Sequence, residues 1–214
     1  MLNGAWAKIC GLRSVEDVLF CQRSGARSVG LNFWPKSKRY VDPACVSSWV
    51  ADLPTEEQLQ RVGVFVNATT EQILPLLEKR VIHVAQLHGD ESPEDCAAIR
   101  EAGFSVWKAI GVRDADSLSV LSEFEVNGIV LDAFCPGEYG GSGKTFRWPL
   151  AVQAQAMIPD TPIILSGGLT PDNVAEAVQC AHPVGVDVAS GVETDPGVKD
   201  RALIEAFIRR ARLD

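Results

Sequence analysis

Hydrophobic residues along this chain recur in short runs that are separated by helix-length stretches. Apolar runs rich in β-branched residues, typical of buried strands, fall at residues 6–11, 27–33, 62–67, 81–88, 104–110, 127–132, 162–167 and 184–190. The intervening stretches have the spacing of helices, over residues 14–24, 43–51, 70–80, 92–102, 114–123, 148–157, 171–181 and 199–212. Several begin at a Ser, Thr, Asp or Pro signal, as at Ser92-Pro93 and Thr170-Pro171. The pattern predicts eight successive strand–helix units.

Alternation of this kind decides the fold class. Eight repeats of strand and helix, with no linker or low-complexity tract between them, are best explained by a closed α/β barrel of the (β/α)8 or TIM type. We therefore predict one barrel domain over residues 1–214. An open, doubly wound sheet is the alternative, because periodicity alone does not show that a sheet closes.

Composition and charge narrow the classes of partner. The chain has 214 residues, of which 46% are hydrophobic and 22% charged, in the range of a folded domain with one large core. No run approaches the roughly 20 apolar residues of a membrane span, and residues 1–11 lack signal-peptide features, so we expect a cytoplasmic protein without a membrane partner. A net charge of −8 and a pI of about 4.9 argue against nucleic acid. Because the net charge is negative, an anionic ligand would have to be bound by hydrogen-bond donors or cations at its own site.

The six cysteines carry no sign of a metal site or a disulfide framework. They are scattered along the chain without a C-x-x-C pair or the His spacing of zinc sites. Disulfides are also rare in proteins of this size in a reducing compartment. We expect no metal, and we expect most of these thiols to be small buried side chains.

Two glycine-containing segments near the C-terminus indicate the class of ligand. Ser166-Gly167-Gly168-Leu169 stands at the end of the seventh predicted strand, and Ser190-Gly191 stands at the end of the eighth. Glycine lets the backbone approach an anion and turn its N–H groups toward it. In (β/α)8 barrels, the loops after the last two strands frequently hold phosphate. We predict a phosphate-binding cup made of Gly167, Gly168, Ser190 and Gly191.

Side-chain alternation predicts which residues face the barrel interior. Lys8 and Cys10 share the inward face of the first strand, and Asp132 ends the sixth strand on its inward face. The same parity groups Val84, Gln86 and His88 on the fourth strand, Val106 and Lys108 on the fifth, and places Asp187 inward on the eighth. In a closed ring only the seventh and eighth strands separate the first from the sixth. Cys10 and Asp132 should then flank the cup as two proton-transfer groups.

Several segments, in order along nearly the whole chain, resemble the signature segments of the phosphoribosylanthranilate isomerase family. They are Lys8-Ile9-Cys10-Gly11-Leu12-Arg13, Pro35-Lys36-Ser37-Lys38-Arg39-Tyr40, Gln86-Leu87-His88-Gly89, Leu131-Asp132 with Gly140-Gly141-Ser142-Gly143 and Phe146-Arg147-Trp148, Ser166-Gly167-Gly168-Leu169, and Gly185-Val186-Asp187 through Ser190-Gly191-Val192-Glu193. One such segment alone would be weak, whereas the set in register is strong evidence.

The resemblance implies an Amadori rearrangement in tryptophan biosynthesis, with a small phosphosugar as substrate and no cofactor. The substrate would be N-(5-phosphoribosyl)anthranilate and the product 1-(o-carboxyphenylamino)-1-deoxyribulose 5-phosphate. Family correspondence makes Asp132 the general acid and Cys10 the general base. We hypothesise that apolar strand neighbours raise the pKa of the Asp132 carboxyl, and that cations such as Lys8 or Arg13 lower the pKa of the thiol.

Further residues are expected to bind the substrate. The resemblance assigns Arg39 to the anthranilate carboxylate, which a planar guanidinium can hold through two hydrogen bonds. Gly143 belongs to a glycine-rich segment expected to close over the sugar as a lid. His88 is either a ligand contact or a loop-organising hydrogen bond, and Asp187 is a partner for Lys8 or Lys108. Lys36 and Lys38 also fit a solvated loop.

Other functions remain as alternatives at this stage. The run Gly140-Gly141-Ser142-Gly143-Lys144-Thr145 resembles the end of a nucleotide-binding loop, but position 138, where that loop needs glycine, is Glu. A pentose-phosphate epimerase or an indole-forming synthase would share the phosphate cup, and a silent barrel could bind a phosphorylated ligand. The sequence does not separate a monomer from a homodimer.

Overall fold

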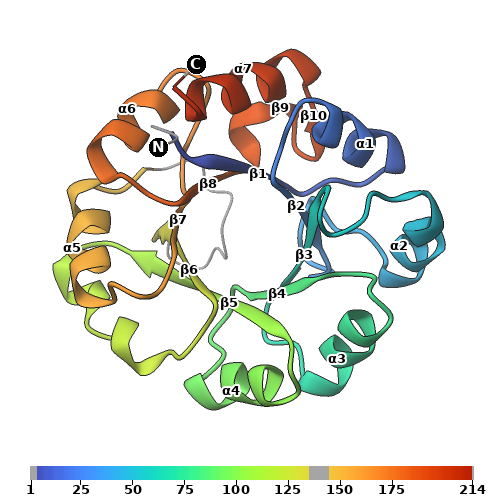
Figure 1. The fold of residues 1–214 in the computed structure, drawn as a ribbon, viewed down its shortest axis with the longest axis horizontal. Coiled ribbons are helices and arrows are strands. Elements are labelled where there is room, and N and C mark those ends of the chain that lie inside the picture. The colour runs from blue at the N-terminus through green and yellow to red at the C-terminus, as the bar shows by residue number, and fades with distance from the viewer. Residues whose placement is uncertain (1–3, 135–144, 214) are drawn as a thin grey trace.

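The computed structural model describes residues 4–134 and 145–213 and shows a closed barrel of eight parallel strands (Figure 1). The strands pair in chain order, and the last pairs with the first, which excludes the open sheet. They are β1 (Trp6–Cys10), β2 (Ser28–Asn32), β3 (Gln60–Phe65), β4 (Val84–Leu87), β5 (Ser105–Val112), β6 (Gly128–Ala133), β7 (Ile163–Leu165) and β8 (Gly185–Val188). The predicted (β/α)8 barrel is confirmed.

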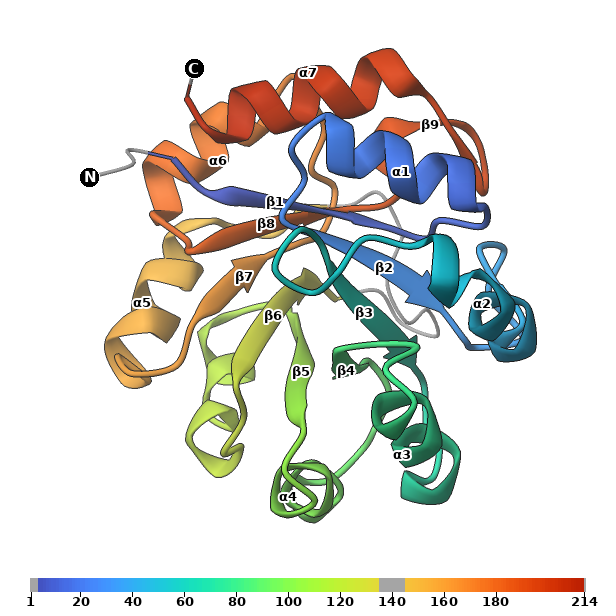
Figure 2. The ribbon, with the colours of Figure 1, turned by 45° about the vertical axis from the view of Figure 1, so that its right-hand side comes forward.

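Helices surround the strands on the outside of the barrel (Figure 2). They are α1 (Val15–Arg23), α2 (Pro43–Trp49), α3 (Thr70–Glu78), α4 (Pro93–Glu101), α5 (Pro149–Met157), α6 (Val174–Ala181) and α7 (Arg201–Ala211), with a 3-10 turn η1 (Val50–Asp52) after α2. Side chains of Ser14, Asp42, Ser92 and Asp200 accept hydrogen bonds from the first free N–H groups of α1, α2, α4 and α7. None of the helices within the described residues is long and apolar enough to cross a bilayer.

The helix predicted over residues 114–123 is wrong. Two 3-10 turns, η2 (Ala115–Leu118) and η3 (Leu121–Glu123), take its place. Asp114 accepts a hydrogen bond from the Ser117 N–H, and the Ser119 hydroxyl donates to the Asp116 carbonyl. Serine and aspartate side chains here compete for the backbone groups that an α-helix would use, so the turns stay tight and short.

The last predicted helix begins later than expected. Residues 193–199 form a small antiparallel ribbon of β9 (Glu193–Asp195) and β10 (Val198–Lys199), which follows the 3-10 turn η4 (Ser190–Val192). Gly197, at a φ of +85°, turns the chain between the two strands. Lys199, predicted as the first residue of the helix, therefore lies in the ribbon beside Glu193 and not on α7.

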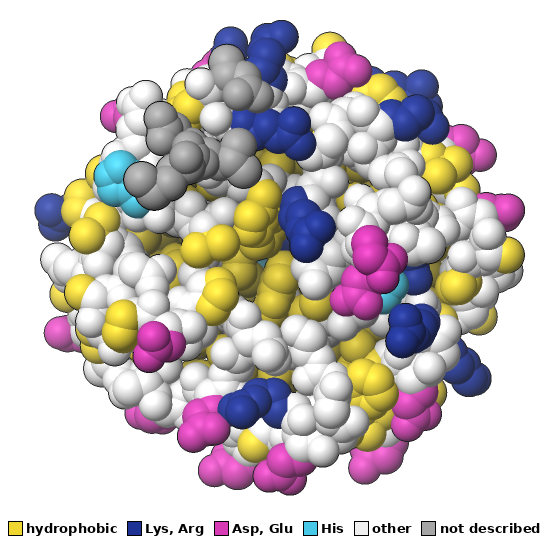
Figure 3. Space-filling model, in the orientation of Figure 1, with side chains coloured by type: hydrophobic (Ala, Val, Ile, Leu, Met, Phe, Trp, Pro, Cys, Tyr) yellow, Lys and Arg dark blue, Asp and Glu magenta, His cyan; other side chains and the backbone are white. Residues whose placement is uncertain are grey.

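The core has two parts. The larger lies between the strands and the helices, and the smaller lies inside the ring and consists of Val62, Val84, Trp107, Ala109, Val130 and Ile164, with Trp6 packed against it. Figure 3 shows hydrophobic side chains gathered near the centre of one face, over the ring of strands, with a basic side chain beside them and most other charged side chains farther out.

This division corrects the predicted faces of β5. Trp107 and Ala109 point into the barrel, whereas Val106 belongs to the outer core and Lys108 pairs with Glu91 on the segment that follows β4. The apolar run that marked this strand gave no sign of its phase, because both faces of a strand in an α/β barrel are covered.

A buried arginine holds the start of β3 and the turn before β4. The Arg61 guanidinium donates hydrogen bonds to the carbonyls of Pro54, Arg80 and Val81, and the Arg61 N–H donates to His83 Nδ1 at 3.0 Å. Burial, together with the charge of Arg61, lowers the pKa of His83 to about 4. His83 is thus a neutral structural histidine.

We predict that His83 makes the folded state less stable in acid. The unfolded chain takes up a proton near pH 6.5 and the folded chain only near pH 4, so stability falls as the pH drops through that interval. In His83→Gln this part of the decline should be absent. Urea unfolding of both proteins between pH 4 and 7 measures it, and parallel pH profiles would contradict the assignment.

Candidate active site

A cavity of about 460 Å³ opens at the carboxyl ends of the strands. Its walls come from β1, β6, β8, the loop between β2 and α2, and the C-terminal ribbon. Among the lining residues are Cys10, Asn32, Trp34, Arg39, His88, Asp132, Ser166, Asp187, Ser190 and Glu193. The structure therefore brings together Cys10, Asp132, Arg39, His88 and Ser190, which the sequence had placed in one site.

Cys10 ends β1 beside a glycine that makes room for its side chain. A Cβ atom added at Gly30, the neighbouring residue on β2, would lie 2.5 Å from the Cys10 sulfur. Two residues earlier on the same face, the fully buried Lys8 ammonium pairs with Asp187 at 2.9 Å. The thiol thus sits above a buried ion pair, and of the two lysines expected as partners for Asp187, Lys8 and Lys108, it is Lys8 that pairs with it.

The predicted direction of the Cys10 pKa is wrong. Burial raises the pKa of this thiol, and the carboxylate of Asp187 adds to the rise. Lys8 and Lys199 act in the opposite direction but do not overcome the burial. Burial therefore favours the thiol over the thiolate, because the hydration that a charged sulfur would lose outweighs its attraction to Lys8 and Lys199.

Asp132 is held at its place on β6 by two hydrogen bonds. Its Oδ1 accepts from the N–H of Ala133 at 2.8 Å, and its Oδ2 lies 3.1 Å from His88 Nε2. The other ring nitrogen, Nδ1, lies 3.0 Å from Gln86 Nε2. Because the Gln86 amide nitrogen can only donate, Nδ1 accepts, and the ring proton on Nε2 donates to Asp132. His88 thus organises the carboxyl group.

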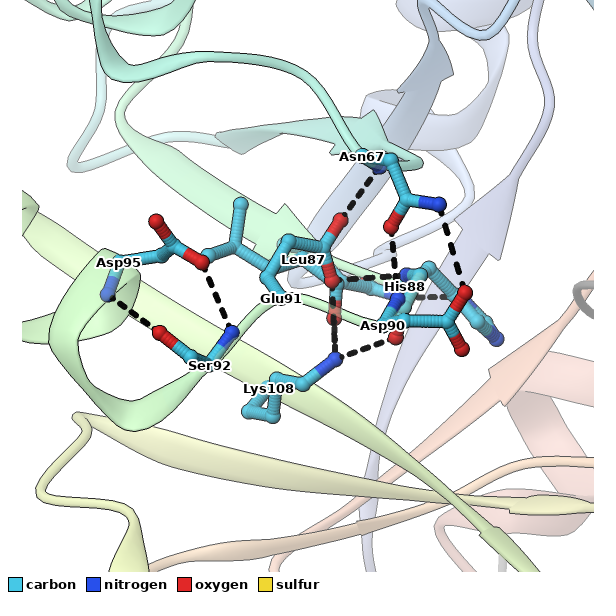
Figure 4. Close-up of polar contacts among 10 residues, drawn as sticks. Asn67, Leu87, His88, Asp90, Glu91, Ser92, Asp95 and Lys108 are labelled. Atoms are coloured by element: carbon cyan, nitrogen blue, oxygen red, sulfur yellow. Dashed lines mark hydrogen bonds and ion pairs between the residues drawn. The ribbon is translucent and has the colours of Figure 1, made fainter.

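A buried lysine fixes the loop that carries His88 (Figure 4). The Lys108 ammonium donates to the carbonyls of Leu87 and Gly89, on either side of His88, and pairs with Glu91 at 2.9 Å. The same Glu91 carboxylate accepts from the backbone N–H groups of Gly89 and Asn67. Lys108, which was predicted to face the interior, instead secures this loop from outside the ring.

The two glycine turns predicted as a phosphate cup lie next to each other. Gly167 and Gly168 both have positive φ, at +83° and +60°, which favours glycine. A Cβ atom at Gly191 would overlap the Leu169 carbonyl oxygen, so the turn after β8 packs directly on the turn after β7. Ser190, beside Gly191, lines the cavity.

Arg39 lies over the end of β1 in a network of charges. Its Nε and Nη2 donate to the two carboxylate oxygens of Glu193 at 2.8 and 2.7 Å, and Lys199 also pairs with Glu193 at 2.7 Å. Hydrogen bonding to Glu193 raises the pKa of Arg39. Burial works to raise the pKa of Glu193, but its two cationic partners outweigh this and lower it.

Glu193 and Lys199 are the site residues that the sequence reasoning missed. Glu193 stood in a family-like segment but received no role, and Lys199 was placed in a helix. The usable signal was the charge alternation between these two residues around Pro196-Gly197, which is typical of a turn between two strands. Across the described residues, no cluster of three His, Cys, Asp or Glu side chains could hold a metal ion.

Residues 7–210 match the family model of N-(5'-phosphoribosyl)anthranilate (PRA) isomerase. The chain belongs to this isomerase family. The Geobacter metallireducens N-(5'-phosphoribosyl)anthranilate isomerase is 43% identical over 205 residues, which cover 96% of this chain and 98% of the relative. Membership of the family separates this chain from the epimerase and synthase alternatives.

Solved structures of the isomerase family have the same fold. The Thermotoga maritima phosphoribosyl anthranilate isomerase is 39% identical, with a TM-score of 0.88, and the match covers 98% of this chain and 100% of that one. A second crystal structure, 38% identical with a TM-score of 0.85 and the same coverage, is a complex with reduced 1-(o-carboxyphenylamino)-1-deoxyribulose 5-phosphate. A further Thermotoga maritima structure concerns monomers generated from a dimeric isomerase.

The predicted lid segment, with Gly143, lies outside the residues that the structure describes. Its role stays a prediction.

We predict that Gly30→Ala displaces the thiol of Cys10. The added methyl would overlap the sulfur, and overpacking of this kind costs about 1–3 kcal/mol of unfolding free energy. Chemical denaturation measures the loss. In a Cys10→Ala background the same change should cost less, because the sulfur is gone. An equal cost in both backgrounds would show that the thiol is not the obstacle.

Proposed function

We propose that this protein isomerises N-(5-phosphoribosyl)anthranilate to 1-(o-carboxyphenylamino)-1-deoxyribulose 5-phosphate in tryptophan biosynthesis, and that it works in the cytoplasm. Its membership of the isomerase family supports the reaction. The observation that carries the proposal is the position of Cys10 and Asp132 on the wall of one cavity. The strands that carry them are separated in the ring only by β7 and β8, whose glycine turns lie between them.

Asp132 is proposed as the general acid. It gives a proton to the ring oxygen of the ribose, and the ring opens to a Schiff base between the sugar and the anthranilate nitrogen. The hydrogen bonds from His88 and from the Ala133 N–H fix the direction of the carboxyl group. A fixed donor loses little orientational freedom in the transition state.

Cys10 is proposed as the general base that removes the proton from C2 of the Schiff base. The resulting enolamine then tautomerises to the ketone. Burial makes the free thiol a weak acid, so it must first lose its proton to solvent, and the nearby Lys8 ammonium stabilises the thiolate that then accepts the C2 proton. The positive charge of the Schiff base would favour the thiolate in the same way. The base thus becomes active chiefly when substrate is bound.

The remaining residues are proposed to bind the two anionic ends of the substrate. Arg39 takes the anthranilate carboxylate. The turns with Gly167, Gly168, Ser190 and Gly191 take the phosphate, as glycine-rich strand ends do in other barrels. His88 also contacts the sugar from its place beside Asp132, and Gly143 is proposed to cover it.

The decisive experiment is turnover of freshly generated phosphoribosylanthranilate by the purified protein, without added metal or nucleotide. Cys10→Ser and Asp132→Asn should each lower kcat by at least about a hundredfold, the usual scale for loss of a general acid or base. Cys180→Ser, which changes an exposed cysteine on α6, is the matched control and should keep full activity. An inactive wild type that binds ribose 5-phosphate would support the proposed phosphate-binding turns and refute the proposed isomerisation.

Arg39→Ala should raise KM by about 10-fold to 100-fold, because a charged hydrogen-bonding partner of the carboxylate contributes about 1.5–3 kcal/mol. Arg39→Lys keeps the charge but loses the planar pair of donors, so it should recover only part of the affinity. Steady-state kinetics and thermal unfolding of both variants make the comparison. An unchanged KM in the folded Arg39→Ala protein would remove the assignment.

A further inference from the structure

Glu193 is buried between two cations at the edge of the cavity. Its side chain is only 4% exposed, and its carboxylate accepts from Arg39 on both oxygens and from Lys199 on one. Burial of a carboxylate in this way is costly unless its partners are well placed. Glu193 and Arg39 both line the cavity, with Lys199 buried behind them, so the network has a place in ligand binding as well as in the stability of the fold.

Among the residues that the structure describes, the Arg39 guanidinium donates only to Glu193, which leaves one of its edges for a ligand. Glu193 takes the edge formed by Nε and Nη2. The second edge of the guanidinium, formed by Nη1 and Nη2, matches a second carboxylate equally well. Because Arg39 lines the cavity, a carboxylate bound there could use this second edge while Glu193 keeps the first.

Two further features position Arg39, one at its backbone and one at its stem. The Arg39 N–H donates to the Ser37 hydroxyl oxygen at 3.1 Å. Gly11, with a φ of +80°, lets the stem pass over it, because a Cβ atom there would lie 2.5 Å from the Arg39 Cδ. Contacts within the protein thus hold the backbone, the stem and one guanidinium edge of Arg39.

Lys199 connects this arrangement to the other end of the site. Its side chain is 1% exposed, and its ammonium donates to the Ala189 carbonyl at 2.8 Å as well as to Glu193. Ala189 immediately precedes Ser190 in the turn proposed for phosphate. Glu193 and Lys199 face each other across the ribbon, so the ribbon fixes both contacts together.

We propose that Glu193 and Lys199 are positioning residues which hold Arg39 in the orientation that binds an aromatic carboxylate, and which tie that subsite to the turn after β8. The proposal rests on the proposed function, since it assumes that the ligand carries both a carboxylate and a phosphate.

Positioning and simple charge balance predict opposite results. Removing the negative charge of Glu193 leaves an extra net positive charge in the cavity, which by itself would tighten the binding of an anion. Loss of positioning would free the Arg39 side chain and weaken binding instead. The sign of the change therefore distinguishes the two roles.

The test is calorimetric binding of two ligands to the wild type and to Glu193→Gln, Arg39→Ala and the double variant. Reduced 1-(o-carboxyphenylamino)-1-deoxyribulose 5-phosphate carries both anionic groups, and ribose 5-phosphate carries only the phosphate. Glu193→Gln should weaken binding of the first by about tenfold and of the second by less than about twofold. The double variant should bind the first ligand no more weakly than Arg39→Ala, because both changes remove the same interaction.

Two variants complete the design. Lys199→Met should weaken the binding of both ligands, since Lys199 contacts Glu193 beside Arg39 and the Ala189 carbonyl beside the proposed phosphate turn. Glu205→Gln removes a similar charge from an exposed position on α7, outside the cavity lining, and should change neither affinity. Thermal unfolding shows whether each variant is folded, and Glu193→Asp, which keeps the charge, replaces Glu193→Gln if the latter does not fold.

Tighter or unchanged binding of the first ligand to Glu193→Gln would overturn the proposal. Additive losses in the double variant, or equal losses for both ligands in Glu193→Gln, would also overturn it. Turnover of the wild type is measured separately. A wild type that binds the reduced product but does not turn over phosphoribosylanthranilate contradicts the proposed function. The roles of Glu193 and Lys199 are then still decided by the calorimetric comparison of the variants.

Discussion

Pairing of the first strand with the last is the constraint on which the rest of the structure depends. Trp6 to Ile9 of β1 are in register with Gly185 to Val188 of β8, and the Trp6 indole occupies the space that a Cβ at Gly185 would fill. This closure brings Lys8 to Asp187 across 179 positions of sequence. It also sets Cys10 beside the C-terminal turn and ribbon, so the cavity exists only because the ring is closed.

Among the residues that the structure describes, three lysines with buried side chains hold the segments around the cavity in place. Lys8 pairs with Asp187 under the thiol, Lys108 with Glu91 behind His88, and Lys199 with Glu193 behind Arg39. Two of these lysines also bind backbone carbonyls of the loops that they secure. Buried ion pairs add little net stability, because desolvation offsets attraction, but a lysine with several fixed acceptors gives a loop one preferred conformation.

The sequence was a good guide where a signal was local. Eight apolar runs located the strands, and capping residues such as Ser92 marked the starts of helices. Cys10, His88 and Asp132 were found because alternation along a strand carries them to one face and one end. The approach failed on β5, where both faces are apolar and Lys108 gave the wrong phase. It failed again over residues 114–123, where serine side chains compete with the helical backbone.

By itself, the sequence determined the eightfold strand–helix repeat, the glycine turns and the aspartate, thiol and arginine that line the cavity, because repeated local patterns and short motifs encode them. Only the tertiary structure decided that Glu193 and Lys199 surround Arg39, that Lys108 supports the loop of His88, and that burial outweighs Lys8 in setting the Cys10 pKa. These features depend on the distances between segments far apart in the chain and on the water that packing removes, and neither quantity is written in a local pattern.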